Sequence, residues 1–502
     1  MSDALFGALL FVVALVPRAA VSLAWSGEPV WDGHYYDFGA RRIAAGFGYS
    51  DDRAVAGALA WHPWCHYPVG YSGFLAGFYR VLGASHAVAS VANALTGAAL
   101  AVVTWGLARH ALSPARARAA GLVVALHPGM ILYAALVMSE PLAALLTLGA
   151  FWLAVRDRRP ARGLVAGALM LGVAALVRPQ ALLCAPFLGA FAGIADGSAR
   201  PASVAVASDA PRSGRWPAGG SGRWLAGGWR WRAIAAVGAL ALALLPVLPW
   251  TARNCRVLDG CALVSTNGGW NLAIGAFPRA TGRFETLRSS DGCRDVTGQV
   301  EQDRCWLKYG LGEIAARPWH WLALVPAKLG FTFDHESFAV EYLHEARPEA
   351  WPAETRERAR EATTLAHRLL LVAAALGAVA YPITRSSRAA ATQGALLAAV
   401  AGLVVVGLST DSPSFWPLAI FAAGVPWLPL PGRPGAPAAM RLALSLLATT
   451  LFTHAVFFGE DRYHVVVTPV LALLAAAALR PVARAPAQSR SGLPQRQSGA
   501  QP

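Results

Sequence analysis

Charged residues are scarce in this sequence. Of its 502 residues, 14% are charged and 56% are hydrophobic, which excludes a single soluble domain of ordinary composition. Such a balance is typical of a membrane protein with several spans. The formal net charge of +15 raises nucleic-acid binding as an alternative, but arginine blocks beside apolar runs are what the positive-inside rule produces. We therefore expect membrane lipids as partners and no nucleic acid.

Three patterns typical of other classes are also missing. The first 25 residues lack the basic start of a secretory signal peptide, so we expect an uncleaved first span. No internal repeat is visible. No paired CxxC spacing occurs among the six cysteines, which argues against metal ligation by them. Four of them, Cys255, Cys261, Cys293 and Cys305, share one polar segment, where an oxidising compartment would favour disulfides in any of three pairings.

Apolar runs are abundant, and twelve of them approach the roughly 20 helical residues that cross a bilayer. They lie near residues 4–25, 82–108, 119–137, 139–155, 163–178, 180–195, 233–250, 364–384, 389–408, 413–430, 439–458 and 464–479. The predicted fold is an all-α polytopic integral membrane protein of about twelve transmembrane helices, with extracytoplasmic loops and interfacial helices.

Arginine placement predicts the orientation, because cytoplasmic loops retain Lys and Arg. With twelve spans and both termini in the cytoplasm, the arginine-rich loops all fall on the cytoplasmic side. Residues 26–81 and 251–363 then face the exterior. We expect interfacial helices near 36–46 and at 317–333, the second anchored by aromatic residues and a lysine, namely Trp319, Trp321 and Lys328.

The predicted organisation has four parts. Residues 1–250 form an N-terminal membrane half that includes the outer loop 26–81, and residues 251–363 form an extracytoplasmic insert. Residues 364–480 supply the C-terminal membrane helices, and 481–502 a disordered cytoplasmic tail. Within the first part, the Gly, Ser, Pro and Arg-rich stretch 197–232 is typical of a flexible linker.

The first outer loop contains WDGHYYDFGARRIAAGFGYS, residues 31–50. Asp32, Tyr36 and Ala40 recur at a spacing of four, so a helix would place them on one face. This pattern allows Asp32 to be a catalytic carboxylate or simply the cap of that helix. Tyr67 follows in HYPVGY, before the second span.

A second acidic candidate is Glu140 in MSEPL, at the outer end between the third and fourth spans. A carboxylate near hydrocarbon is costly unless it has water, a cation or a partner. The alternative is a helix start, with Ser139 and Pro141 opening the fourth span.

Basic residues collect at the same outer ends, although the charge rule disfavours them there. These are Arg178 in LVRPQALL, Arg253 in PWTARN, and Arg462 with His464 in GEDRYH. A phosphate or pyrophosphate would suit guanidinium groups. The alternative is an ion pair with Glu140, Asp461 or a lipid headgroup.

The order of these motifs resembles the GT-C superfamily of glycosyltransferases, and more closely the bacterial branch with protein O-mannosyltransferases and the lipid A aminoarabinose transferase. The resemblance rests on the first-loop motif and HYPVGY, then on ALHPGMILYAALVMSEPL, LVRPQALL, PWTARN, STNGGWNLAIGA and GEDRYHVVVTPVLALLAA. It implies transfer of a sugar from a polyprenyl-phosphate donor to a lipid, glycan or protein acceptor. It also implies a bacterial inner-membrane enzyme whose active site faces the periplasm.

By motif position, the resemblance makes Asp32 and Glu140 the candidate catalytic residues. Some relatives carry adjacent Asp and Glu in the first loop, where this chain has Asp32 and Gly33, with Asp37 one turn away. Metal dependence differs among relatives, and a divalent ion would use Asp32 and Glu140. The residues expected to bind substrate are Tyr36, Asp37, Tyr67, Arg178, Arg253, Arg462 and His464.

The expected chemistry is attack of an acceptor hydroxyl on the anomeric carbon, with Asp32 as general base and inversion of that carbon. The arginines, with His464, would stabilise the departing lipid phosphate. A lipid or solute transporter or flippase is the alternative function, although it would be expected to bury ionisable residues near the midplane and to show repeated halves. A non-catalytic scaffold would need no such residues on one face.

Overall fold

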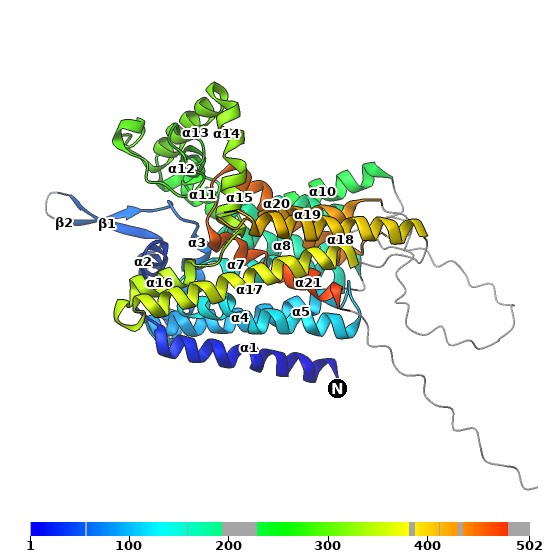
Figure 1. The fold of residues 1–502 in the computed structure, drawn as a ribbon. Helices are drawn as coiled ribbons and strands as arrows, with labels where there is room; N and C mark the ends of the chain where they lie inside the picture. Colours follow the sequence, from blue (N-terminus) through cyan, green and yellow to red (C-terminus); the bar gives the residue numbers. More distant parts are fainter. Residues whose placement is uncertain are drawn as a thin grey trace, which may run out of the picture.

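The computed structural model describes residues 2–55, 58–157, 159–192, 228–380, 387–410, 412–429 and 435–479. This part is a bundle of long helices with small elements gathered at one end, on the left in Figure 1. The predicted tail at 481–502 and most of the predicted linker at 197–232 lie outside the described residues.

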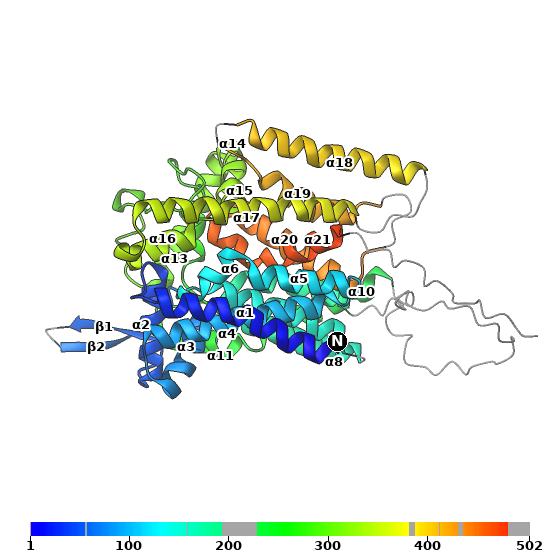
Figure 2. The same cartoon turned by 60° about the horizontal axis from the view of Figure 1, so that its bottom comes forward.

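Long and short helices make up the bundle, and the long ones run along a common direction (Figure 2). Those of the N-terminal half are α1 Asp3–Trp25, α4 His86–Ala108, α5 Pro114–Leu126, α6 Pro128–Leu132, α7 Glu140–Arg156, α8 Pro160–Val177, α9 Ala185–Ala192, α10 Trp229–Leu244 and α11 Leu248–Val257. Those of the C-terminal part are α17 Ala353–Ala380, α18 Ser387–Leu408, α19 Trp416–Gly424, α20 Ala438–Val456 and α21 Thr468–Ala478. Short 3-10 helices join them at η1 Tyr133–Ala135, η2 Pro179–Cys184, η5 Val425–Trp427 and η6 Asp461–Val466.

The all-helical, polytopic prediction is confirmed, and each of the twelve predicted apolar runs contains helix. Six helices are long and apolar enough to cross a membrane, or eight if two bent pairs each count as one span, among the described residues. Three further apolar helices, at Pro179–Ala192, Trp416–Trp427 and Thr468–Ala478, are shorter. The number of described helices that are long and apolar enough to cross a membrane is therefore below the predicted twelve.

Proline explains the bent pairs, because its ring removes a helical hydrogen bond and clashes with the preceding turn. The predicted span 119–137 bends by 55° after Leu126, where Pro128 opens α6. The span that begins at Trp229 bends by 52° between α10 and α11, at a segment that contains Pro246.

Arg18 of α1 holds the first of these bends in place. Its side chain is fully buried and donates hydrogen bonds to the carbonyls of Val124 and Ala125, at 2.9 and 2.7 Å, in the last turn of α5. Gly97 of α4 leaves the necessary room, since a Cβ there would lie 2.5 Å from Arg18 Nε. A positive charge at carbonyls of a helix C-terminus is favourable.

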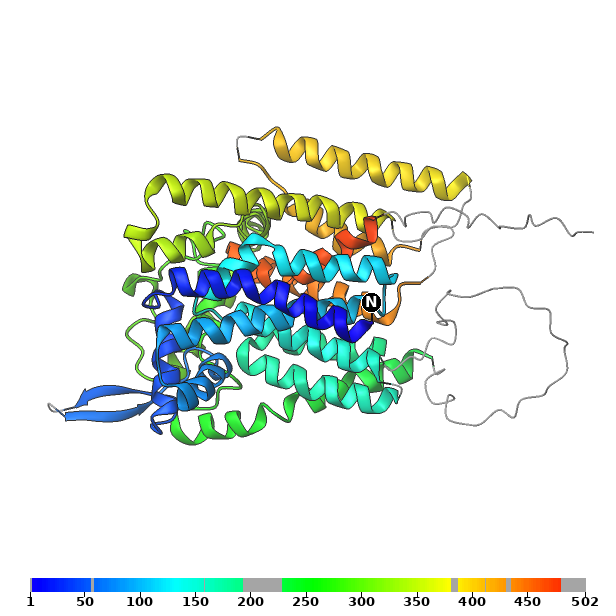
Figure 3. The same cartoon turned by 90° about the horizontal axis from the view of Figure 1, so that it is seen from below.

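The small elements gather at the end of the bundle that we call the loop end, seen from below in Figure 3. They are α2 Asp32–Ala44, β1 Ser50–Val55, β2 Ala58–Pro63, α3 Val69–Leu82, α12 Gly268–Ile274, η3 Ser289–Asp291, α13 Gln299–Ala316, α14 Pro318–Ala323, α15 Val325–Phe333, α16 Phe338–Ala346 and η4 Pro348–Ala350. The two strands pair antiparallel as a hairpin, which the sequence analysis did not predict. The predicted interfacial helix at 36–46 corresponds to α2.

The predicted helix at 317–333 is two helices, α14 and α15, that meet at Leu324. Trp319 is 80% exposed, as expected of an anchor, but Lys328 is fully buried. The Lys328 ammonium donates to the carbonyls of Ala455 and Val456, at 3.4 and 3.1 Å, where α20 ends. Lys328 was therefore wrongly predicted as a surface anchor.

Two disulfides stabilise the segment after α10, as the cysteine positions allowed. Cys255 pairs with Cys261, and Cys293 pairs with Cys305. The structure thus selects one of the three pairings that the sequence left open. Cys65 and Cys184 are free and buried.

Candidate active site

A cavity of about 360 Å³ opens at the loop end of the bundle, where α2, the C-terminal end of α8 and η6 come together. Its walls carry one carboxylate, two guanidinium groups and several aromatic rings. Prominent among the lining residues are Asp32, Tyr36, Tyr67, Arg178, Trp270 and Arg462. Five of these six were predicted from the sequence as site residues.

Asp32 begins α2 and turns its carboxylate into the cavity. Tyr67 Oη donates to one carboxylate oxygen at 2.7 Å, and Arg462 Nη1 donates to the other at 2.5 Å. The cap position belongs to Trp31, and no side-chain cap bond forms there. The Asp32 carboxylate therefore bonds to Tyr67 and Arg462 and does not act as the cap of α2.

The backbone just before Asp32 is strained. Trp31 has a φ of 50°, the one positive value among the non-glycine residues that the structure describes. Its ring lies 5.4 Å from Phe338 and 5.8 Å from Tyr342, which hold it from α16. Such strain is kept where surrounding packing enforces it, and it is common at functional sites.

The electrostatics keep Asp32 ionised. Burial alone would raise the pKa of this carboxyl, but the positive charge of Arg462 and the hydrogen bonds from Tyr67 and Arg462 outweigh burial and lower it. An opposite charge in contact favours the charged form of an acid. Asp32 is thus available as a proton acceptor at neutral pH.

Glu140 lies behind the cavity wall and holds Arg178 in place. The Glu140 side chain is fully buried and accepts a hydrogen bond from Arg178 Nη1 at 2.5 Å. The same guanidinium nitrogen lies 3.3 Å from Ser139 Oγ, and Ser139 makes no side-chain cap bond to α7. Glu140 therefore has a cation partner, as its position near hydrocarbon required.

Arg462 links three acidic residues. Besides Asp32, it forms an ion pair with Glu460, and its Nε lies 4.0 Å from Glu140 Oε1. Asp461, which the sequence offered as an alternative partner, instead accepts hydrogen bonds from the backbone N–H groups of Ser337 and Phe338 at the start of α16.

Glu460 was missed by the sequence analysis, although it stands two residues before Arg462. Burial raises the pKa of this carboxyl to about 7, more than the neighbouring Arg462 lowers it. Asp32, Asp461 and Glu140 add to the rise because like charges disfavour ionisation. Glu460 therefore titrates near neutral pH beside an aspartate that stays ionised.

Aromatic rings complete the wall of the cavity. Tyr67 packs against Tyr36, with centroids 5.4 Å apart, and Trp270 lies 5.9 Å from His66. His66, Trp270 and Tyr463 were not predicted, because nothing in the sequence distinguishes them from ordinary core aromatics. Rings of this kind offer a large apolar surface with polar edges.

Three residues predicted to bind substrate lie away from this cavity. Asp37 pairs with Arg41 at 2.6 Å and accepts from Tyr79, which braces α2 against α3. Arg253 donates to the carbonyls of Tyr49 and Trp64 at 2.6 and 3.1 Å. His464 points to the opposite side of η6, toward Thr332 and Glu336. These contacts hold the three side chains outside the lining of the cavity.

Asp32 and Glu140 do not fit a divalent ion. A guanidinium nitrogen stands 2.5 Å from each carboxylate, in the place where a metal would bind. A cation brought there would be repelled by both arginines. The positive charge of this cavity comes from side chains.

No family model and no curated protein matches the sequence of this chain. Among solved structures, an oligosaccharyltransferase from Archaeoglobus fulgidus tethered with an acceptor peptide is similar, with 14% identity and a TM-score of 0.39 over 93% of this chain. The chain covers 49% of that protein, about half its length. The archaeal oligosaccharyltransferase AglB from Archaeoglobus fulgidus, in complex with an inhibitory peptide and a dolichol-phosphate, has a TM-score of 0.35 at 14% identity, over 93% of this chain and 50% of that one. ArnT from Cupriavidus metallidurans bound to undecaprenyl phosphate has 15% identity and a TM-score of 0.34, over 95% of this chain and 78% of that one.

Proposed function

We propose that this chain is a membrane glycosyltransferase that moves a hexose or pentose from a polyprenyl-phosphate donor to an acceptor outside the cytoplasm. The observation that carries the proposal is the joining of Asp32 with Arg178 and Arg462 in one cavity at the end of a membrane bundle. The motif order described above supports the same reading. The acceptor would be a lipid, glycan or protein.

The cavity contains the groups that such a transfer needs. Asp32 would accept the proton of an acceptor hydroxyl as the oxygen attacks the anomeric carbon, and the bond from that carbon to the phosphate oxygen would break. Arg178 and Arg462 would stabilise the phosphate that leaves on its lipid. Attack opposite the phosphate would invert the anomeric carbon. Because the lipid tail stays in the bilayer, a cavity at the end of the bundle is within reach of the donor.

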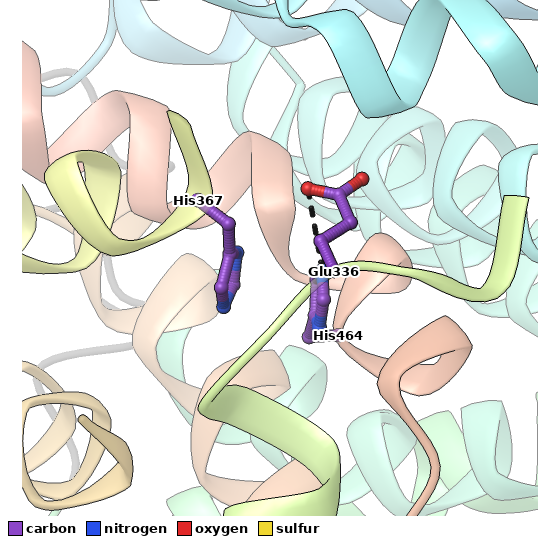
Figure 4. Close-up of side chains that lie close together, drawn as sticks. All are labelled: Glu336, His367 and His464. Atoms are coloured by element: carbon purple, nitrogen blue, oxygen red, sulfur yellow. Dashed lines mark ion pairs between the residues drawn. The ribbon is translucent and has the colours of Figure 1, made fainter. Parts of the chain in front are cut away.

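The direct test is sugar transfer by the purified protein. We expect radiolabelled sugar on polyprenyl phosphate to pass to an acceptor fraction from bacterial envelopes, with free polyprenyl phosphate as the other product. The alternative function is a lipid transporter or flippase, and the observation that suits it is the buried ionisable cluster of Glu336, His367 and His464 (Figure 4). A transporter would relocate the donor in liposomes and leave its sugar–phosphate bond intact.

The rate of the proposed sugar transfer should depend on pH through Glu460. When its carboxyl loses a proton near pH 7, the new charge competes with Asp32 for Arg462 and makes Asp32 a stronger base. We expect the wild-type transfer rate to rise as pH increases through about 7. In Glu460→Gln this step should vanish, leaving a nearly flat profile between pH 6 and 8. A step of unchanged position and size in Glu460→Gln would show that another group controls the rate.

The proposed orientation places the cavity on the periplasmic side of a bacterial cytoplasmic membrane, because the described arginine-rich loops at 109–118 and 159–162 lie at the other end of the bundle (Figure 1). A cysteine introduced at Ala353, exposed at the start of α17, should react with an impermeant thiol reagent in intact cells. A cysteine at Ser113, exposed before α5, should react only after permeabilisation. The native free thiols, Cys65 and Cys184, are buried and give little background. The reverse pattern of labelling would refute this orientation.

A further inference from the structure

The cavity of Asp32 has an uncharged part, formed by α12 at the loop end (Figure 1). Residues 267, 270 and 271 are three and four positions apart, so they share one face of this helix. We call these residues, with the neighbouring His66, the α12 wall. Its members are Asn267, Trp270, Asn271 and His66, and all four line the cavity. The charged lining residues Asp32, Arg178 and Arg462 come from other elements.

Helix α12 is held firmly against α13. Asp303 Oδ1 accepts hydrogen bonds from the backbone N–H groups of Gly269 and Trp270, at 2.7 and 3.2 Å. A Cβ at Gly269 would lie 2.0 Å from the Asp303 carbonyl oxygen, so the two backbones are in contact. The disulfide between Cys293 and Cys305 ties α13 to the preceding loop. The wall is therefore in place before a ligand arrives, which lowers the entropic cost of binding.

Neighbouring rings fix the orientation of the Trp270 indole. The fully buried ring of Trp306 lies 5.5 Å away at an angle of 78°, and the ring of His66 lies 5.9 Å away at 90°. Trp270 itself is half-buried and lines the cavity, so part of its ring is open to a ligand. An aromatic ring offers a large apolar surface of fixed shape. The C–H groups on one face of a sugar ring suit such a surface.

The polar groups of the α12 wall are neutral and available. In the part of the chain that the structure describes, the Asn271 amide has no hydrogen-bond partner. Asn267 Oδ1 accepts from Ser265 Oγ at 2.8 Å, which leaves the Asn267 NH₂ group free to donate. Burial lowers the pKa of His66 more than the charge of Asp32 raises it, so the imidazole is neutral at pH 7. Amides both donate and accept, as sugar hydroxyls do.

Building on the proposed function, we propose that the α12 wall binds the sugar of the donor and selects a neutral sugar over an amino sugar. The sugar is bonded directly to the phosphate, so it must lie beside the arginines, and a cavity of about 360 Å³ is large enough for both groups. Trp270 would pack on the sugar ring, and the amides of Asn267 and Asn271 would bond to its hydroxyls.

Charge is the reason for the selection. The ammonium group of an amino sugar would lie near two guanidinium groups, and like charges repel. Asp32 is the one acidic residue among the described residues that line the cavity, and its carboxylate is already paired with Arg462 at 2.5 Å. An amino sugar would therefore leave water without gaining an anionic partner.

The test measures binding, so that its outcome is separate from that of sugar transfer. Full-length protein in detergent is titrated calorimetrically with three polyprenyl phosphodiesters, which carry a neutral hexose, an amino-deoxy hexose or a methyl group. The methyl diester has the charge of the donor but no sugar. We expect the neutral hexose to improve affinity about 10-fold over the methyl diester, through ring packing and hydrogen bonds. The amino sugar should bind no better than the methyl diester.

Trp270→Leu should weaken binding of the neutral-sugar diester about 10-fold and leave binding of the methyl diester unchanged. Trp64→Leu is the matched control. Trp64 is another half-buried tryptophan of the loop end with two ring neighbours, Tyr49 at 5.2 Å and Tyr67 at 5.8 Å, but it does not line the cavity. Its loss should leave both affinities unchanged.

Asn271→Asp keeps the proposal testable if Trp270→Leu does not fold. The new side chain has the same size but carries a negative charge, so the ratio of the two sugar affinities should shift about 10-fold toward the amino sugar. The proposal is overturned if wild-type protein binds the neutral-sugar and methyl diesters equally, if both tryptophan variants lose equal affinity, or if Asn271→Asp leaves the ratio unchanged. Selective binding of the neutral sugar without any transfer would reject the transferase and support the sugar site.

Discussion

Asp32→Asn is expected to lower sugar transfer by about 10² to 10⁴-fold, the usual loss when a general base is removed. The amide matches the carboxylate in size, and its oxygen can still accept a hydrogen bond from Tyr67 or Arg462. It cannot take up a proton. Arg462 keeps its ion pair with Glu460, so the variant should remain folded and inserted. The measurement is the transfer rate with saturating donor and acceptor, alongside size-exclusion chromatography.

Asp37→Asn is the matched control for this prediction. Asp37 is another acidic residue of α2 with an arginine and a tyrosine as partners, but it does not line the cavity. Its loss should change the rate far less. Near-normal transfer by a folded Asp32→Asn protein would remove Asp32 from the mechanism, whereas equal losses in both variants would point to the integrity of α2.

Glu140→Leu should destabilise the protein by about 3–5 kcal/mol, because it leaves the Arg178 guanidinium without its buried partner. Arg178 is only 15% exposed, so water replaces the lost carboxylate poorly. The double variant Glu140→Leu with Arg178→Met should regain most of this stability, since apolar residues of similar volume can replace a buried pair. Thermal unfolding in detergent compares the three proteins.

The same double variant separates structure from chemistry. If Arg178 stabilises the leaving phosphate, a protein with restored stability should still transfer sugar poorly. Full activity in the double variant would show that the pair serves only to hold α7 against the end of α8. A Glu140→Leu protein as stable as the wild type would contradict the buried-pair argument itself.

The helical segments could be predicted because an apolar run is a local property of the sequence. The lengths of the helices were harder to predict, because prolines such as Pro128 bend or divide an apolar run. The average hydrophobicity of a run does not show where such a bend occurs. Lys328 was misplaced for a related reason. Its position in an aromatic, half-apolar stretch is typical of an interfacial anchor, but the end of α20, more than a hundred residues later in the chain, supplies carbonyls for its charge.

Site residues could be predicted where an arginine occupies a position that the positive-inside rule disfavours. In the predicted orientation, Arg178 and Arg462 stand at outer helix ends, where the charge rule disfavours arginine. Both line the cavity with Asp32. The segment GEDRYH was harder, because η6 is a 3-10 helix with three residues per turn. This period places Asp461 and His464 on one side, toward residues 335–337, and Arg462 on another. The sequence therefore grouped His464 with Arg462, although the two side chains point to different sides, and it did not single out Glu460.

The buried Arg18 also bears on the order of events during synthesis. An arginine at the centre of a membrane helix costs about 2.5–3.5 kcal/mol on insertion, and here the carbonyls that offset this cost belong to residues 106 and 107 positions further along the chain. When α1 leaves the ribosome, its partner has not yet been made. We infer that α1 settles to its final depth only after α5 has emerged. Until then Arg18 needs water or the translocation channel, so ribosome stalling before residue 124 should leave α1 only loosely integrated.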